Sequence, residues 1–72
     1  MNATKEFKIG EQVEFEYYPY STISGTVVNE DSKYISVRFD KPVTWEAKSS
    51  TYQWDVGYEM DFLKSKIIEV KK

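Results

Sequence analysis

The sequence contains no cysteine and no histidine among its 72 residues. The lack of cysteine excludes disulfides and thiolate metal sites, and it fits a reducing cytoplasm. Without histidine, imidazole acid–base catalysis is excluded, and a zinc site lacking both residue types would be very unusual. We therefore expect no enzyme activity, no metal, no cofactor and a cytoplasmic location.

Several other patterns that support catalysis or ligand binding are also missing. The chain has no Ser-x-x-Lys motif and no Gly-rich phosphate loop. The oxygen-rich segment 29–32 lacks the spacing of a calcium loop, so we expect a β-turn there. No stretch approaches the ~20 apolar residues of a membrane span, and residues 1–8 lack the apolar run of a signal peptide. We expect no membrane association.

Acidic and basic residues are nearly balanced, at twelve and ten, for a net charge of −2. Residues 1–36 hold six acidic and three basic residues, whereas residues 37–72 hold six and seven. Proteins that bind nucleic acid by counterion release usually carry a clear basic excess. The chain as a whole lacks one, although four lysines fall in its last nine residues.

Aromatic residues are abundant, with four Phe, six Tyr and two Trp. A chain of this length forms one domain, residues 1–72, and we expect an ordered core of about residues 7–70. Such a small domain buries only about 60% of the surface of its unfolded chain, and each aromatic can bury roughly 150–250 Å². By alternation, the phenylalanines fall at core positions: Phe7, Phe15, Phe39 and Phe62.

A two-residue hydrophobic period dominates the chain and predicts strands. In residues 11–17, Val13, Phe15 and Tyr17 share one face. Further strands are predicted by the same pattern at residues 23–28, 34–39, 52–56 and 67–70. Gly25, inside the second strand, indicates a bulge or a close backbone approach.

Two segments do not follow this period clearly. Residues 59–64 are interpreted as a single helical turn. Residues 44–51 remain undecided, since residues 45–48 could start a helical turn but residues 49–51 are typical of a loop. Five short strands are best buried in a small closed or nearly closed barrel, which removes most exposed strand edges.

Four segments together resemble the small SH3-like barrels, in the broad sense that includes Tudor, chromo-barrel, KOW and many bacterial or phage domains. Residues 7–15 look like the "Phe-x-x-Gly-Asp-x-Val-x-Val" opening of such domains, and residues 25–28 like their "Gly-x-Val" strand. Residues 34–40 resemble a "Tyr-x-Val-x-Phe-Asp" third strand, and residues 62–70 the closing turn and last strand. The resemblance implies an all-β fold: a five-stranded antiparallel SH3-like barrel with one short helical turn before the last strand.

The resemblance does not transfer a ligand. The signalling form of this barrel carries a Trp pair and a Pro-Ser-Asn-Tyr ending, and neither is present. The KOW form has extra glycines where this chain has Tyr18–Thr22. A lone barrel of this size is also similar to the accessory proteins of phages and mobile elements, many of which bind and block a host protein. Because fold does not imply function, the function has to be argued from a surface.

The Tyr and Trp residues outside the predicted core are the candidate surface, because a small barrel holds few interior side chains. In the SH3-like class the loops after the first and third strands lie at the same end, so Tyr18, Tyr20 and Trp45 are expected to converge. The candidate partner-binding residues are Tyr18, Tyr20, Trp45, Tyr52 and Trp54.

This surface has several possible roles. The aromatics could anchor a protein partner, form a cage for a cation, stack bases of a single strand, or only cover a thin core. We favour a noncatalytic protein-binding module, with inhibition of a host protein as one form of it. The alternative is a nucleic-acid-binding domain of KOW or Tudor type that uses Arg38, Lys41, Lys64, Lys66 and Lys71. A third hypothesis is a homo-oligomer that buries its aromatics between copies of the chain. The sequence leaves the oligomeric state open.

Outward carboxylates on the first strand have a structural interpretation. If the last strand lies antiparallel to the first, Glu14 and Glu16 face a strand that carries Glu69 and Lys71, with Lys66 close by. Opposite charges across strands contribute ~0.2–1 kcal/mol per pair. We therefore favour cross-strand pairing over an acidic docking face.

Overall fold

The computed structural model describes residues 6–71. Residues 1–5 and 72 lie outside this range, and with them most of the segment examined for a signal peptide. The described chain is all-β, with seven strands and one 3₁₀ turn. Its elements are β1 (Gln12–Glu16), β2 (Ile23–Glu30), β3 (Tyr34–Phe39), β4 (Val43–Glu46), β5 (Thr51–Trp54), β6 (Glu59–Leu63), η1 (Lys64–Lys66) and β7 (Ile68–Lys71).

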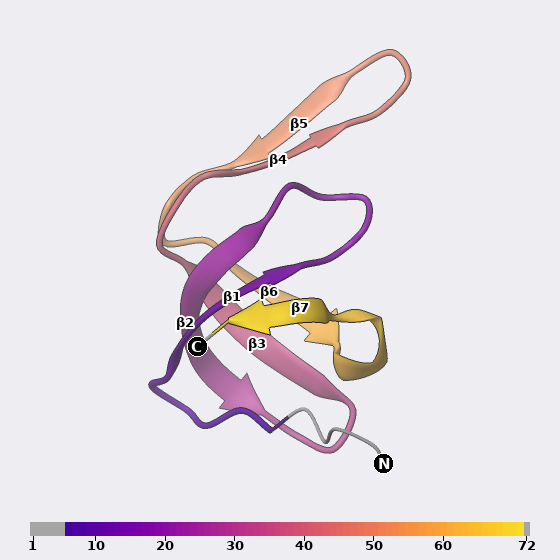
Figure 1. Ribbon diagram of the computed structural model, residues 1–72. Helices are drawn as coiled ribbons and strands as arrows, with labels where there is room; N and C mark the ends of the chain where they lie inside the picture. Colours follow the sequence, from indigo (N-terminus) through magenta and orange to yellow (C-terminus); the bar gives the residue numbers. More distant parts are fainter. Residues whose placement is uncertain (1–5, 72) are drawn as a thin grey trace.

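The strands form two antiparallel sheets (Figure 1). Five strands pair in the order β6-β3-β2-β1-β7, and β4 pairs with β5 in a separate hairpin. Within residues 6–71, β6 and β7 each pair along one edge only, so the five-stranded sheet is open and no closed barrel forms. The predicted all-β antiparallel fold is confirmed, but the strands of the sheet are not the five predicted ones. The strand predicted at residues 52–56 lies in the hairpin as β5, and β6 takes its place in the sheet.

The core lies on one face of the sheet and follows the predicted alternation. In β1 and β3 every second residue is buried, and the intervening residues are exposed or half-buried. All four phenylalanines are buried, as predicted. The buried residues are Phe7, Val13, Phe15, Ile23, Val27, Ile35, Val37, Phe39, Val43, Phe62 and Ile67.

Gly25 lies where β2 comes closest to β3. A Cβ built on Gly25 would stand 2.2 Å from the carbonyl oxygen of Arg38 and 2.5 Å from a methyl carbon of Val37. The predicted close backbone approach is therefore confirmed. The irregularity of the β2–β3 ladder lies further along, because the register shifts between Val27 and Asn29.

The helical turn predicted for residues 59–64 is wrong. This segment is strand β6, paired residue for residue with β3. Its pattern of polar and apolar residues fits a strand as well as one helical turn, and extended pairing buries Phe62 completely. A short helical turn does precede the last strand, as predicted, but it is η1 and begins at Lys64.

Residues 45–48 do not start a helical turn either. Val43–Glu46 is strand β4, and the turn of its hairpin closes through a hydrogen bond from the Ala47 N–H to the Ser50 carbonyl (2.8 Å). The buried Val43 shows that the strand pattern resumes at this residue, directly after the break at Pro42.

Strands β1 and β7 are antiparallel, as predicted, and Glu14 lies opposite Lys71. The register shifts between Glu14 and Glu16, whose partner is Ile68. Three steps along β7 thus span the distance of two steps on β1, and Glu69 within this bulge has a φ of +53°.

The turn between β2 and β3 lies at residues 31–33 and overlaps the segment 29–32 predicted as a β-turn, whose first two residues belong to β2. The Asp31 carboxylate accepts hydrogen bonds from the backbone N–H groups of Tyr34 and Lys33, both at 2.8 Å. These two bonds favour the ionised form and hold the pKa of Asp31 below its ordinary value. Asp31 therefore has a local structural role.

Candidate partner-binding surface

The β4–β5 hairpin, hereafter the arm (residues 43–54), reaches away from the five-stranded sheet (Figure 1). Its base is fixed to the β1–β2 loop by two hydrogen bonds. The Ser21 N–H donates to the Thr44 carbonyl (2.8 Å), and the Thr44 N–H donates to Ser21 Oγ (3.0 Å). This loop carries Tyr18 and Tyr20, so the fixed base brings the loop aromatics toward those of the arm.

Tyr20 connects the core to the arm. Its ring centroid lies 6.5 Å from that of the buried Phe62, 5.4 Å from Trp54 and 6.0 Å from Trp45, each in an edge-to-face arrangement. Such geometry is the favoured one for aromatic pairs. Tyr20 and Trp54 are both half-buried and pack against the hydrophobic core. These two residues therefore have a structural role whatever else they do.

The outer part of the arm carries an aromatic pair. Trp45 and Tyr52 are directly opposite each other across the two strands, and their rings stack with centroids 5.0 Å apart. Tyr52 is 46% exposed. Because alternate residues of a strand share a face, Val43, Trp45, Tyr52 and Trp54 line one side of the arm. We refer to Trp45, Tyr52 and Trp54, with Tyr20 at the base, as the aromatic surface.

The structure thus brings four of the five predicted residues together and leaves the fifth apart. Tyr18 is 90% exposed, and within residues 6–71 no aromatic ring pair includes it. The expected convergence therefore holds for Tyr20 and Trp45 but not for Tyr18. The reason is local, since the Tyr20 N–H binds the Tyr17 carbonyl (2.8 Å) in a tight turn that leaves Tyr18 at its outer corner.

Two neighbouring residues were not singled out from the sequence. Tyr58 is 48% exposed and its ring lies 6.4 Å from that of Trp54, while Val56 is also exposed. The local pattern gave no signal for Tyr58, because β5 ends at Trp54 and a turn, closed by a hydrogen bond from the Tyr58 N–H to the Asp55 carbonyl (3.2 Å), separates the two residues.

The five basic residues of the alternative site come from different parts of the fold: β3, the β3–β4 loop, η1 and β7. Arg38 pairs with Glu59 (3.8 Å), and Lys64 pairs with Glu30. Lys66 is exposed on η1. Two of the five charges are therefore already balanced by carboxylates, and these bases do not lie along one strand or one loop.

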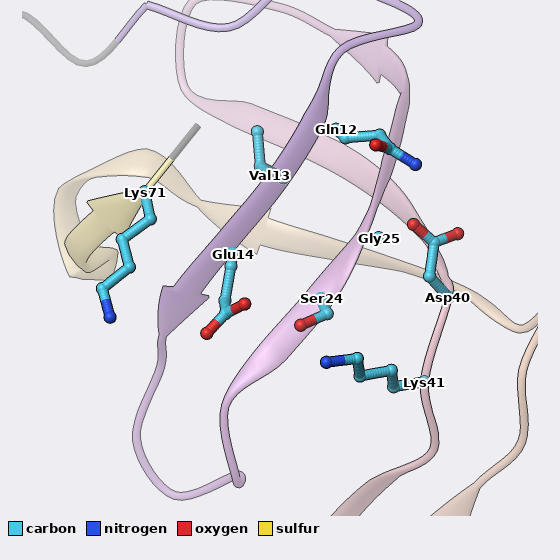
Figure 2. A pocket seen from close by; sticks show the side chains of 8 residues that line it. All are labelled: Gln12, Val13, Glu14, Ser24, Gly25, Asp40, Lys41 and Lys71. Carbon is cyan, nitrogen blue, oxygen red and sulfur yellow. The ribbon is translucent and has the colours of Figure 1, made fainter.

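Lys41 and Lys71 line an open groove of about 290 Å³ on the outer face of β1 and β2. Figure 2 shows the two lysines on either side of Glu14 and Ser24. Glu14 and Asp40 also line this groove. Because each lysine has a carboxylate as a neighbour in the lining, the groove offers no net positive charge for a polyanion.

Comparisons with protein-family models, with curated proteins and with solved structures found no match. The resemblance to SH3-like barrels therefore stays a prediction. Within residues 6–71, no helix is long and apolar enough to cross a membrane. Nor do the acidic side chains in this range gather into a group of three or more that could hold a metal ion.

Proposed function

We propose that this protein is a noncatalytic protein-binding module whose contact surface is the aromatic surface of the arm. The observation that carries the proposal is the stacked Trp45–Tyr52 pair, half-exposed on a two-stranded arm that reaches away from the sheet. Tyr and Trp are the residues most enriched among interface hot spots. Such an arm can present them to a partner without disturbing the core.

The charges around the aromatic surface favour a protein partner over nucleic acid. The arm carries Glu46 and Lys48, and Asp55 follows it directly, so its ionisable groups give no positive patch. Stacking proteins that bind single strands combine their aromatics with a basic groove along the backbone. That combination is missing here, because Arg38 and Lys64 are paired with acidic residues on the five-stranded sheet.

We further propose that the fold is an SH3-like barrel in the broad sense, opened between β6 and β7 and extended by the arm. The order of the strands in the five-stranded sheet supports this assignment, as do the four sequence segments that resemble such barrels. A cytoplasmic host protein that the module binds and inhibits would suit a chain without cysteine. This assignment rests on resemblance, whereas the binding surface rests on geometry.

The test uses a double variant, W45A with Y52A, in a pull-down from host lysate with nuclease present. We expect capture to weaken about 30-fold or more, the effect of losing ~2 kcal/mol at a hot spot. Both rings lie outside the core, so circular dichroism should show an intact sheet. The single variant Tyr34→Ala is the matched control, because Tyr34 is similarly exposed, at 43%, on β3 of the other sheet.

Two results would contradict the proposal. One is equal capture by the wild type and the folded double variant. The other is binding that disappears with nuclease and, in an oligonucleotide titration, falls steeply with salt, which would indicate the nucleic-acid alternative.

A further inference from the structure

The outer edge of β5 is an unpaired strand edge. The hydrogen bond between Ala47 and Ser50 closes the arm, so bonded and non-bonded pairs must alternate from there. Trp45 and Tyr52 then form a bonded pair, while Thr51 and Gln53 direct their N–H and C=O groups away from β4. Within residues 6–71, no strand pairs with this side of β5.

The outer edge of β4 is occupied at Thr44. By the same alternation, Thr44 directs its backbone groups outward, and Ser21 binds both of them. Toward the tip, Glu46 also directs its backbone groups outward, but its exposed carboxylate places a charge on this edge. The β5 side of the arm is therefore the better suited of the two for another strand.

The two edges of the five-stranded sheet carry features that discourage pairing. On β6, the exposed residues Glu59 and Asp61 bring negative charge to the edge, and the Leu63 N–H donates to the Tyr17 hydroxyl (3.2 Å). On β7, the bulge at Glu69 breaks the regular ladder. Charged residues and bulges are the usual means by which proteins protect sheet edges. The β5 edge has neither charge nor bulge, since Thr51–Trp54 is uncharged and regular.

We propose that β5 pairs antiparallel with β5 of a second copy, which joins two arms into a four-stranded sheet. The edge is complementary to itself. With the two-fold axis at Tyr52, Thr51 lies opposite the partner's Gln53, and the outward backbone groups of both meet in register. No like charges face each other across the new ladder. The central pair is then Tyr52 with the partner's Tyr52, an aromatic pair of the kind that stabilises sheets.

The pairing would place both aromatic surfaces on the same side of the new sheet, because residues opposite each other across two strands point to the same face. The dimer is then bivalent toward a partner. The contact is made by the backbone edge of β5, and Tyr52 at its centre is the one residue of the aromatic surface that takes part. The inference needs no bound partner, so it goes beyond the proposed function and stands without it.

A charge swap at Thr51 and Gln53 tests this pairing. Both side chains are exposed on the side of the arm opposite the aromatic surface. In the double variant T51K with Q53K, each lysine faces the partner's lysine, and in T51E with Q53E each glutamate faces a glutamate. We expect either variant alone to dimerise about tenfold more weakly than the wild type, and an equal mixture to recover the dimer.

The measurement is sedimentation equilibrium on the full chain, whose monomer mass is 8.5 kDa. A wild-type chain that stays monomeric up to ~1 mM overturns the proposal. A dissociation constant of this size corresponds to a binding free energy of only about −4 kcal/mol, which is too weak for a specific dimer. Wild-type association that neither charged variant weakens, or a mixture that does not recover it, overturns it as well.

A second variant separates this inference from the proposed function. Among the backbone hydrogen-bonding groups of the arm, Q53P removes only an outward N–H, because the bonded pairs between β4 and β5 do not include Gln53. We expect a monomer that still captures the protein partner, whereas W45A alone should dimerise but lose capture. The control for Q53P is Q53A, which keeps the N–H and should remain dimeric.

Discussion

At the scale of single residues, Gly25 matters because it has no side chain. It lies opposite Phe39 in the β2–β3 ladder and opposite Val13 in the β1–β2 ladder, so neighbouring strands flank it on both sides. The space that a Cβ would need is filled by the carbonyl oxygen of Arg38, a backbone atom that cannot move aside as a side chain can. The strand spacing at the centre of the sheet therefore depends on glycine here.

Replacing Gly25 with alanine should destabilise the protein by about 2–3 kcal/mol, at the upper end of the usual cost of overpacking, because the sheet itself has to shift. Urea denaturation followed by far-ultraviolet circular dichroism measures the change. Ser24→Ala is the control, since Ser24 is the next residue on β2 and points its side chain to the outer face. Equal stability of G25A and the wild type would show that the two strands can separate at little cost.

Residue alternation predicted the core well and the half-buried aromatics less well. The phenylalanines and the inward residues of β3 were predicted because one face of each strand is buried against the core. Tyr20 and Trp54 were predicted as surface residues, yet they pack against the core. Their position depends on the arm packing against the β1–β2 loop, a contact between residues 23 or more positions apart that no local pattern encodes.

At the scale of elements, β4 and β6 escaped prediction because their short patterns run into residues that also fit one helical turn. β4 has four residues and β6 five, and strands of this length give only two or three inward positions. One turn of helix can place the same number of apolar residues on its inward side. What decides for a strand is pairing with β5 or β3, a contact that the local sequence does not specify.

The bulge in β7 gives a prediction at this scale. Glu69 has a φ of +53°, in the left-handed region that costs a residue with a side chain roughly 1–2 kcal/mol. Glycine tolerates this conformation but loses about 0.5–1 kcal/mol through the entropy of the unfolded chain. Glu69→Gly should therefore stabilise the protein by about 0.5–1 kcal/mol in urea denaturation.

The same substitution at Glu16 should have the opposite sign. Glu16 lies in β1 beside the bulge, with a regular strand backbone, so glycine there only adds entropy to the unfolded chain and should destabilise by about 0.5–1 kcal/mol. Destabilisation by both substitutions to a similar extent would mean that the Glu69 backbone stores no strain.

At the scale of the whole molecule, the sheet and the arm differ in what supports them. Of the eleven buried hydrophobic residues within residues 6–71, only Val43 belongs to the arm. An isolated two-stranded hairpin is marginally stable in water. The arm is held by the Ser21–Thr44 hydrogen bonds and by the rings around Tyr20. Folding of the arm therefore depends on the five-stranded sheet more than folding of the sheet depends on the arm.

Native-state hydrogen exchange should therefore show two levels of protection. The amides of Trp45 and Tyr52 form a bonded pair in the arm, while the amide of Val37 lies in β3 between two strands of the sheet. Once corrected for intrinsic rates, and at a concentration where the chain is monomeric, the arm amides should exchange at least about tenfold faster than Val37, because local opening of the arm exposes few buried side chains. Equal protection would instead mean that the Tyr20 cluster couples the two sheets into one cooperative unit.

Raising the protein concentration provides a second comparison, because pairing of β5 with a second copy should slow exchange in the arm and leave Val37 unchanged. If the exchange rates of the arm amides do not change with protein concentration, the aromatic surface binds its partner as part of a single chain. If these amides alone become protected, the paired β5 edges bring two aromatic surfaces together in one dimer.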